Sequence, residues 1–443
     1  MARTNQRSRS DFYTRPAAFG VAAAALAAVV VSLDRAHSRG RLSYPGILET
    51  GSAEDARTIL ITVASISLTV VTLLASLTFV ALSFATSTVG PRQLRSFLRD
   101  RTTQYTFATF IGTFVYCLIV LLFYRGNDPQ GKLAAFAPHL GAVTALVLAL
   151  IATAMLVAYI HNLTRAIQPN YVLVRIVKEL DRAMVDYGQA RSLHASSCGS
   201  IDDGEMAHIA EERREPYEQV TAQRSGYVQQ IDHDPLVDVA RQHDAMIRFT
   251  VRPGQFVLQG NPIAHVWGLN SAVEASIHRV TDVGGYRTLA QDLEFAVDQL
   301  VEVALRALSP AINDTFTALS CVDWLGEALR KFATTDVGTP VHCDAAGHVR
   351  VIDRPVRFQS LVTAAFAKIR QSGANNPAVV MRLLETHTAI VGFLTAAQCS
   401  VLRTEIEATA ALAATQKFAA IDTAGVHTRA VRAREACSGL GPQ

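Results

Sequence analysis

Charged residues are scarce in this sequence. Asp, Glu, Lys and Arg make up 18% of the 443 residues, hydrophobic residues make up 50%, and the mean hydropathy of +0.21 is high for a soluble protein. The net charge of +3 is too small to indicate a nucleic-acid binder, and no basic run alternates with aromatic residues. The composition therefore excludes a typical nucleic-acid-binding protein and predicts a membrane-embedded part joined to a soluble part.

The sequence also lacks the motifs of common enzyme active sites. It contains no G-x-S-x-G, H-E-x-x-H, Walker-type or G-x-G-x-x-G motif. Its six cysteines are scattered without a C-x-x-C pair, which indicates neither a disulfide framework nor a zinc site. We therefore predict that the protein is not an enzyme and carries no cofactor.

Long apolar runs dominate the first third of the chain. We predict four membrane spans, each close to the roughly 20 apolar residues that cross a bilayer. The first span follows several arginines, as a signal peptide would, but no small-residue cleavage site follows it, so we expect a retained anchor. The predicted spans are Ala17–Leu33, Ile59–Ala85, Tyr105–Tyr124 and His139–Ile160.

Arginine and lysine flank these spans unevenly. They are more frequent before the first span, after the second and after the fourth than in the two other flanking regions. Because basic loops stay in the cytoplasm, we expect both termini to be cytoplasmic. No Asp, Glu, Lys or Arg lies inside a predicted span, which argues against an ion-coupled carrier.

The second span carries six hydroxyl residues on one helical face. Small hydroxyl residues allow helices to approach closely and to hydrogen-bond to each other, and we favour this packing interpretation. The alternative is a polar pore lining, formed by several copies of the span around one axis. The six residues are Thr62, Ser65, Thr69, Thr72, Ser76 and Ser83.

Beyond the fourth span, the pattern predicts an α+β region in the cytoplasm, with a small β-module followed by helical hairpins. Pro169 interrupts the helix that leaves the last span, and Pro253-Gly254 marks a turn between alternating segments. The predicted organisation is a four-span domain (1–165), an amphipathic connecting helix (166–190), a polar linker (191–216), a β-rich module (217–275), a helical domain (276–422) and a polar tail (423–443).

The β-rich module is similar over a short stretch to a barrel-sandwich module of the biotinyl/lipoyl type. The stretch reads AMIRFTVRPGQFVLQGNPIAHVW. The segment contains no lysine, so attachment of lipoate or biotin is excluded, and we favour a small structural module.

Three separate blocks carry a second resemblance. They read SFATSTVGPRQLRSFLRDRTTQYTFATFIGTFVYCLIVLL, RTLAQDLEFAVDQLVEVALRALSPAINDTFTALSCVDWL and NNPAVVMRLLE. They resemble a bacterial family of predicted integral membrane proteins, domain of unknown function 2254. The resemblance implies a four-span protein of the bacterial inner (cell) membrane with a cytoplasmic C-terminal region, and it implies no known activity. Where the family pattern leads us to expect proline, this chain has Thr315, which should slightly loosen the start of the next helix.

The polar residues of the second block form the candidate site. The broad apolar face of the stretch 287–308 predicts a helix that Ser309-Pro310 ends, and Asp314 is the predicted N-cap of the next helix. Asp292 precedes Arg306 by about four helical turns, so both can lie on one helix face. The hinge that follows can then fold Asn313 and Asp314 back towards Arg306. We favour a structural network that fixes two packed helices, and the alternative is an anion-binding site around Arg287 and Arg306. The candidate residues are Arg287, Gln291, Asp292, Arg306, Asn313 and Asp314.

A separate group, His342-Cys343-Asp344 with His348, contains metal-ligating residue types. Ligands on one hairpin turn rarely complete a tetrahedral site by themselves. We therefore predict a polar turn and no metal site.

Three functional hypotheses remain. The first is a homo-oligomeric, channel-like or permeability-regulating membrane protein with a cytoplasmic sensing domain. The second is a non-conducting membrane scaffold or sensor that binds a cytoplasmic partner. The third, a membrane-anchored enzyme acting near Arg287 and Arg306, is disfavoured by the missing motifs. The expected partners are the lipid bilayer and further copies of the chain, and no nucleic acid.

Overall fold

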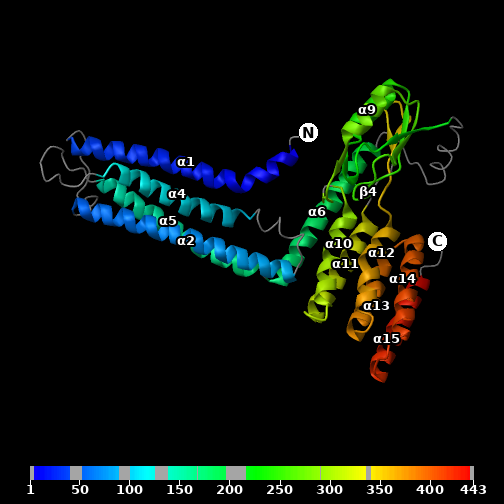
Figure 1. Ribbon diagram of the computed structural model, residues 1–443. Helices are drawn as coiled ribbons and strands as arrows, with labels where there is room; N and C mark the ends of the chain where they lie inside the picture. Colours follow the sequence, from blue (N-terminus) through cyan, green and yellow to red (C-terminus); the bar gives the residue numbers. More distant parts are fainter. Residues whose placement is uncertain are drawn as a thin grey trace. The chain divides into compact units, whose positions relative to one another are not determined.

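The structure is a computed structural model of the chain. It describes residues 4–39, 52–88, 100–124, 138–166, 168–195, 216–289, 291–335 and 341–439, so most of the predicted polar linker lies outside the described residues. The chain divides into two compact units, residues 1–172 and residues 173–443 (Figure 1).

Unit 1 consists of long apolar helices that lie side by side (Figure 1). Four helices are long and apolar enough to cross a membrane, which confirms the four apolar helices predicted from the sequence. The third of them, α4, packs against the other three, and the small side chains of Ala27, Ala56 and Ala142 allow close approach in the shared core. The helices are α1 (Thr4–Ser38), α2 (Ala53–Thr88), α4 (Arg101–Leu122) and α5 (His139–Ala166).

Acidic residues lie inside two of the candidate spans, namely Asp34 in the first and Glu54 and Asp55 at the start of the second, and Asp34 is buried. The first candidate span is Thr14–Ser38, and it includes Asp34, which is 2% exposed. Its carboxylate accepts hydrogen bonds from the backbone N–H groups of Leu140 (3.1 Å) and Gly141 (3.0 Å) at the start of α5. The expectation of spans without acidic or basic residues is therefore wrong, because α1 continues beyond Leu33 and Asp34 complements the N-terminus of a neighbouring helix.

The helix α6 (Pro169–Ala195) buries the apolar stripe predicted for the connecting segment, including Leu173, Ile176 and Leu180. Its polar side chains also contact later parts of unit 2. The Nζ atom of Lys331 lies 2.8 Å from a carboxylate oxygen of Asp181.

The β-rich part of unit 2 surrounds a large apolar core, to which α8 (Asp234–Gln242) and α9 (Ser271–Val280) also contribute, and Met246, Trp267 and Ile352 form a second, smaller cluster. A five-stranded sheet has the order β1-β5-β3-β8-β7, and a three-stranded sheet has the order β4-β2-β6. The strands are β1 (Glu218–Thr221), β2 (Gly226–Ile231), β3 (Met246–Phe249), β4 (Phe256–Val257), β5 (Pro262–Trp267), β6 (Thr281–Gly284), β7 (Val341–Cys343) and β8 (Val349–Ile352).

The β-rich part is not continuous in the sequence. The antiparallel pair β7–β8 comes from the stretch predicted as the helical domain, and β8 pairs in parallel with β3, with Ile247 opposite Val351. Both side chains are fully buried in the same core. The predicted module 217–275 is therefore too short, because β6 also joins the second sheet and β8 buries its apolar residues beside β3.

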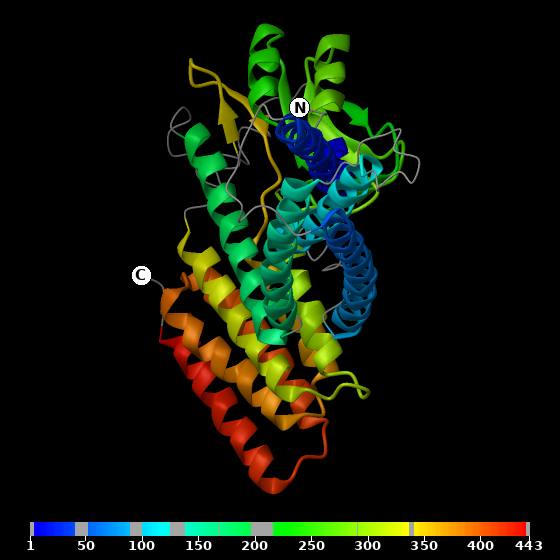
Figure 2. The ribbon, with the colours of Figure 1, turned by 90° about the vertical axis from the view of Figure 1, so that its left-hand side faces the viewer.

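Six helices of unit 2 form three helical hairpins that pack side by side, which confirms the predicted hairpins (Figure 2). The helices α11 and α13 approach closely at Gly326, where a Cβ atom would clash with the side chain of Thr386. The six helices are α10 (Leu293–Ala307), α11 (Thr315–Thr334), α12 (Phe358–Ser372), α13 (Pro377–Ile390), α14 (Ala396–Ala414) and α15 (Ala420–Ser438).

The predicted polar tail is helical as far as Ser438. The helix α15 buries Val426, Ala430, Ala433 and Cys437, which share one face. The prediction missed this helix because small side chains form most of that face.

Four cysteines within the described residues are buried free thiols, namely Cys117, Cys321, Cys399 and Cys437. Cys343 is disulfide-bonded. The scattered cysteines therefore include at least one that forms a disulfide, although no framework was expected.

Candidate functional site

The hinge between α10 and α11 is a tight chain reversal. Asn313 adopts a positive φ of 50°, and the N–H of Asp314 donates to the carbonyl oxygen of Ala307 at 2.8 Å. Asp314 caps α11 by accepting a hydrogen bond from the backbone N–H of Thr317 (3.1 Å), and the Thr317 hydroxyl donates to the same carboxylate. These contacts give the hinge a structural role.

A third segment also contacts the hinge. The side-chain amide of Asn376 donates to the hydroxyl of Thr315 at 3.0 Å, while its oxygen caps α13. A proline at position 315 offers no side-chain acceptor, so Thr315 adds a link between α11 and α13.

The structure separates the six candidate residues into two groups. Asp292 precedes the first residue of α10, whereas Arg306 lies in its last turn, so they are roughly 20 Å apart along the helix. Arg306 lies 3.7 Å from Glu302, and Asp314 is engaged by Thr317. A single network of the six residues is therefore wrong, because the length of α10 separates Asp292 from Arg306 and each end of the helix has its own partners.

The first group forms a largely buried ion-pair cluster at the N-terminal end of α10. The guanidinium of Arg287 donates two hydrogen bonds to Asp292, at 2.7 and 2.9 Å, and one to Asp298 at 2.7 Å. It also lies 5.1 Å from the ring centroid of Phe295. Asp292 is 1% exposed and caps α10 by accepting a hydrogen bond from the Phe295 N–H at 3.0 Å. Sequence reasoning did not identify Asp298, which lies one turn and a half into the helix.

This cluster connects the helical part of unit 2 to the strands. Gln291 accepts from the N–H of Ile231 (2.9 Å) and donates to its carbonyl oxygen (3.0 Å). The Asp292 carboxylate packs against Gly254, whose φ of +92° and missing side chain leave the required space. Burial by itself would lower the pKa of Arg287, but hydrogen bonds to Asp292 and Asp298 raise it, so the guanidinium stays charged.

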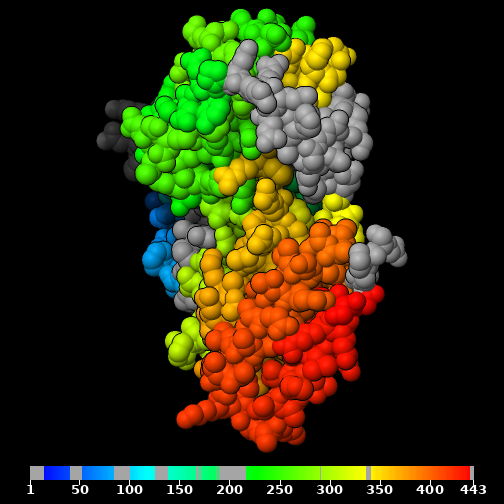
Figure 3. Space-filling view, turned by 90° about the vertical axis from the view of Figure 1, so that its right-hand side faces the viewer, coloured from blue at the N-terminus to red at the C-terminus, as the bar shows by residue number. Residues whose placement is uncertain are grey.

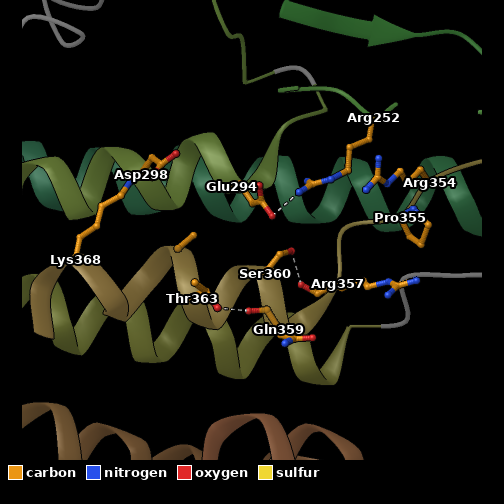
Figure 4. A pocket seen from close by; sticks show the side chains of 11 residues that line it. Arg252, Glu294, Asp298, Arg354, Pro355, Arg357, Gln359, Ser360, Thr363 and Lys368 are labelled. Carbon is orange, nitrogen blue, oxygen red and sulfur yellow. Dashed lines mark hydrogen bonds and ion pairs between the residues drawn. The ribbon is translucent and has the colours of Figure 1, made fainter. Parts of the chain in front are cut away.

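A polar cavity of about 630 Å³ lies beside this cluster (Figure 4). Arg252, Arg354 and Arg357 lie towards one end of the view, and Asp298 and Lys368 lie at the other. The surface view places the segment after β8, coloured gold, between the green strands and the orange and red helices (Figure 3). The remaining lining residues are Glu294, Pro355, Gln359, Ser360, Thr363 and Ala364.

Cationic side chains outnumber carboxylates by four to two in this cavity. Arg252 pairs with Glu294 at 2.6 Å, and Lys368 lies 3.2 Å from Asp298, which also binds Arg287. Arg354 donates to the carbonyl oxygen of Thr250 at 2.6 Å and remains exposed. Arg357 is also exposed. The arrangement can accept a small anion, and sequence reasoning missed it because three separate segments contribute its charges.

The hydroxyl stripe of α2 faces away from the other helices of unit 1. All six hydroxyl residues are exposed, whereas Ala56, Leu60 and Leu74 on the opposite face are buried. Three of the hydroxyls, those of Thr62, Thr69 and Thr72, donate to carbonyl oxygens of their own helix, as hydroxyls commonly do in apolar surroundings. The packing interpretation is therefore wrong within one chain, because the buried face of α2 is its apolar face.

The hairpin β7–β8 contains the polar turn that the sequence predicted. Asp344 accepts from the N–H groups of Ala346 and His348, both at 3.0 Å, and from Arg350 at 2.8 Å. Arg350 lowers the pKa of Asp344 to about 2. His348 is exposed on this turn, whereas His342 is buried in the strand before it.

Four long apolar helices followed by a unit of small sheets and helical hairpins define a membrane protein with four candidate membrane helices and a second folded unit. The chain belongs to the family described as predicted membrane protein (DUF2254), whose sequence model matches residues 9–389. The resemblance noted in the sequence is thereby confirmed.

The curated relatives that the chain matches are described as uncharacterized proteins. The chain is 29% identical over 349 residues to the uncharacterized protein Rv1290c of Mycobacterium tuberculosis and to the uncharacterized protein Mb1321c of Mycobacterium bovis. The matched region covers 77% of this chain and 64% of each relative, so the chain spans less than two thirds of their length. No solved structure matches the chain.

Proposed function

We propose that this protein is a homo-oligomeric, channel-like protein of the bacterial inner membrane, with four spans and both termini in the cytoplasm. In this proposal several copies bring the exposed face of α2 around one axis, and unit 2 acts as a cytoplasmic sensing domain. The outward orientation of the hydroxyl stripe carries the proposal, because packing within the chain leaves all six hydroxyl residues exposed.

Two physical arguments support a polar lining on this face. Hydroxyls bonded to their own backbone tolerate apolar surroundings, yet they retain lone pairs that can bind water or an ion. Hydrogen-bond donors and acceptors that line a pore contribute to its selectivity. Asp34 does not supply a charge for this face, because its carboxylate binds the start of α5.

Replacing Ser65 and Thr72 together by leucine is expected to abolish most of the current of the reconstituted protein, because leucines on the stripe make the lining apolar and expel water. The measurement is conductance in a planar bilayer, preceded by the mass of the purified complex. The matched control is Ala75→Leu, which adds the same side chain at an exposed position of α2 outside the stripe. A stable monomer without conductance, or an equal loss in the control, would contradict the proposal.

The cavity of unit 2 supports a second candidate, a non-conducting membrane sensor for a small anion. The excess of cationic side chains and the exposed Arg354 and Arg357 favour this candidate. Arg287 is a poorer ligand, because Asp292 and Asp298 already occupy its donors. These contacts also weigh against an enzyme that binds substrate through Arg287.

Replacing Arg354 and Arg357 together by glutamine is expected to weaken the binding of inorganic pyrophosphate by roughly tenfold or more, since a hydrogen bond to a charged group contributes about 1.5–3 kcal/mol. Isothermal titration of the full-length protein at fixed ionic strength measures the affinity. Arg434→Gln is the control, because Arg434 pairs with Glu407 outside the cavity. If pyrophosphate does not bind, or if the control weakens it equally, the cavity is not an anion site.

A further inference from the structure

Two histidines and one aspartate converge at a second place in unit 2. His233 lies between β2 and α8, His342 lies in β7, and Asp353 follows β8. One ligand atom from each residue lies within 4.8 Å of the others. The Nε2 atom of His233 is 3.5 Å from a carboxylate oxygen of Asp353, and the two imidazole rings stack with centroids 4.6 Å apart.

The side chain of His233 has a fixed position but does not cap the adjacent helix α8. It occupies the cap position of α8 and forms no cap hydrogen bond. Its Nε2 atom is buried and makes no hydrogen bond within the part of the chain that the structure describes. The ring packs edge-on against Phe249 at 5.6 Å, which restricts its orientation. A buried ring nitrogen beside a carboxylate is a suitable ligand for a cation.

We propose that His233, His342 and Asp353 bind one divalent first-row transition-metal ion such as Zn²⁺. Two imidazole nitrogens and one carboxylate oxygen are a ligand set that Zn²⁺ accepts, with water completing the coordination. Bonds of about 2.1 Å place tetrahedral ligand atoms roughly 3.4 Å apart. The 3.5 Å between His233 and Asp353 already fits this separation, and the ligand atom of His342 lies within 4.8 Å of both, so only a small approach of His342 is needed. Because the rings stack at 20°, one imidazole also rotates.

The surroundings fit such an ion in two respects. The carboxylate of Asp353 accepts a hydrogen bond from the backbone N–H of Arg354 at 2.7 Å. This hydrogen bond orients the carboxylate, as outer-shell partners orient the ligands of a metal ion. His342 lies in the β7–β8 hairpin and Asp353 directly follows it, whereas His233 lies more than a hundred residues earlier, so the ion connects this hairpin to the start of α8. This set differs from the group of His342 with His348, because His348 lies on the exposed turn.

The test is titration of the full-length protein, stripped with a chelator, with Co²⁺ and Zn²⁺. We expect one ion per chain, visible absorption bands from bound Co²⁺ and a higher melting temperature. His342→Ala and Asp353→Asn should each weaken binding at least about 100-fold, since loss of an outer-shell partner alone costs roughly 10–100-fold. His348→Ala should bind as the unmodified protein does, which controls for surface histidines.

Asp353→Asn keeps the test informative if His342→Ala does not fold, because the asparagine oxygen can still accept from the Arg354 N–H. The inference is overturned if the unmodified protein binds no Co²⁺ or Zn²⁺. It is also overturned if His348→Ala reduces binding as much as Asp353→Asn does.

Discussion

Replacing Asp292 by alanine is expected to lower the free energy of unfolding by about 3 kcal/mol or more. The change removes the cap of α10 and two of the three hydrogen bonds that bind the Arg287 guanidinium, which is 19% exposed. Asp298 remains as a partner, so the loss lies towards the lower end of the range for breaking a buried ion pair. Chemical denaturation of the purified full-length protein measures the change.

Two further variants separate the capping contribution of Asp292 from its ionic contribution and provide a surface control. Asp292→Asn keeps an oxygen that can cap α10 and loses only the ionic part, so it should be less destabilising. Glu407→Ala removes an exposed ion pair with Arg434, and it should cost less than about 1 kcal/mol. If Asp292→Ala destabilises the protein no more than Glu407→Ala does, the cluster does not hold the strands and α10 together.

Lowering the pH from 7 to 4.5 is expected to destabilise unit 2 through His387 by roughly 3 kcal/mol. His387 is fully buried, its ring lies edge-on to Phe366 at 4.7 Å, and burial lowers its pKa from 6.5 to about 3. The positive charge of Arg370 makes a smaller contribution to this lowering of the pKa. Between pH 6.5 and pH 3 the unfolded state binds a proton at His387 that the folded state does not bind. The contribution of His387 to the free energy of unfolding is therefore fully present above pH 6.5 and decreases as the pH falls towards 3.

The test compares pH profiles of the unfolding free energy for the unmodified protein and for His387→Leu. The variant should lose this part of the pH dependence, and the difference between the profiles cancels the titration of Glu405, which pairs with Arg370 nearby. His427→Leu, an exposed position on α15, should keep the profile unchanged. Parallel profiles for the unmodified protein and His387→Leu would contradict the assignment.

Local properties made part of this structure predictable. A run of roughly 20 apolar residues predicts a membrane-spanning helix from composition alone. The four apolar helices were therefore predicted close to their observed bounds. The cap at Asp314 and the break at Ser309-Pro310 are also local, because a capping carboxylate and the missing N–H of proline act within a few residues.

The candidate site was less predictable, because the role of Asp292 depends on where α10 begins. Continuous apolar periodicity suggested a helix from Arg287, which put Asp292 and Arg306 on one face. In the structure Asp292 is the cap residue, since its carboxylate is committed to Phe295, Arg287 and the space beside Gly254. The contacts with Gly254 and Ile231 cross from strands to helix, and sequence periodicity carries no information about them.

The sequence by itself determined the four apolar helices, the helical hairpins, the hinge before α11 and the family. Only the tertiary structure decided that the hydroxyl stripe of α2 faces outward, that β8 joins β3, and that His233, His342 and Asp353 meet. The physical reason is that periodicity shows which residues share a face, whereas the partner of that face is set by packing between segments that are separate in the sequence.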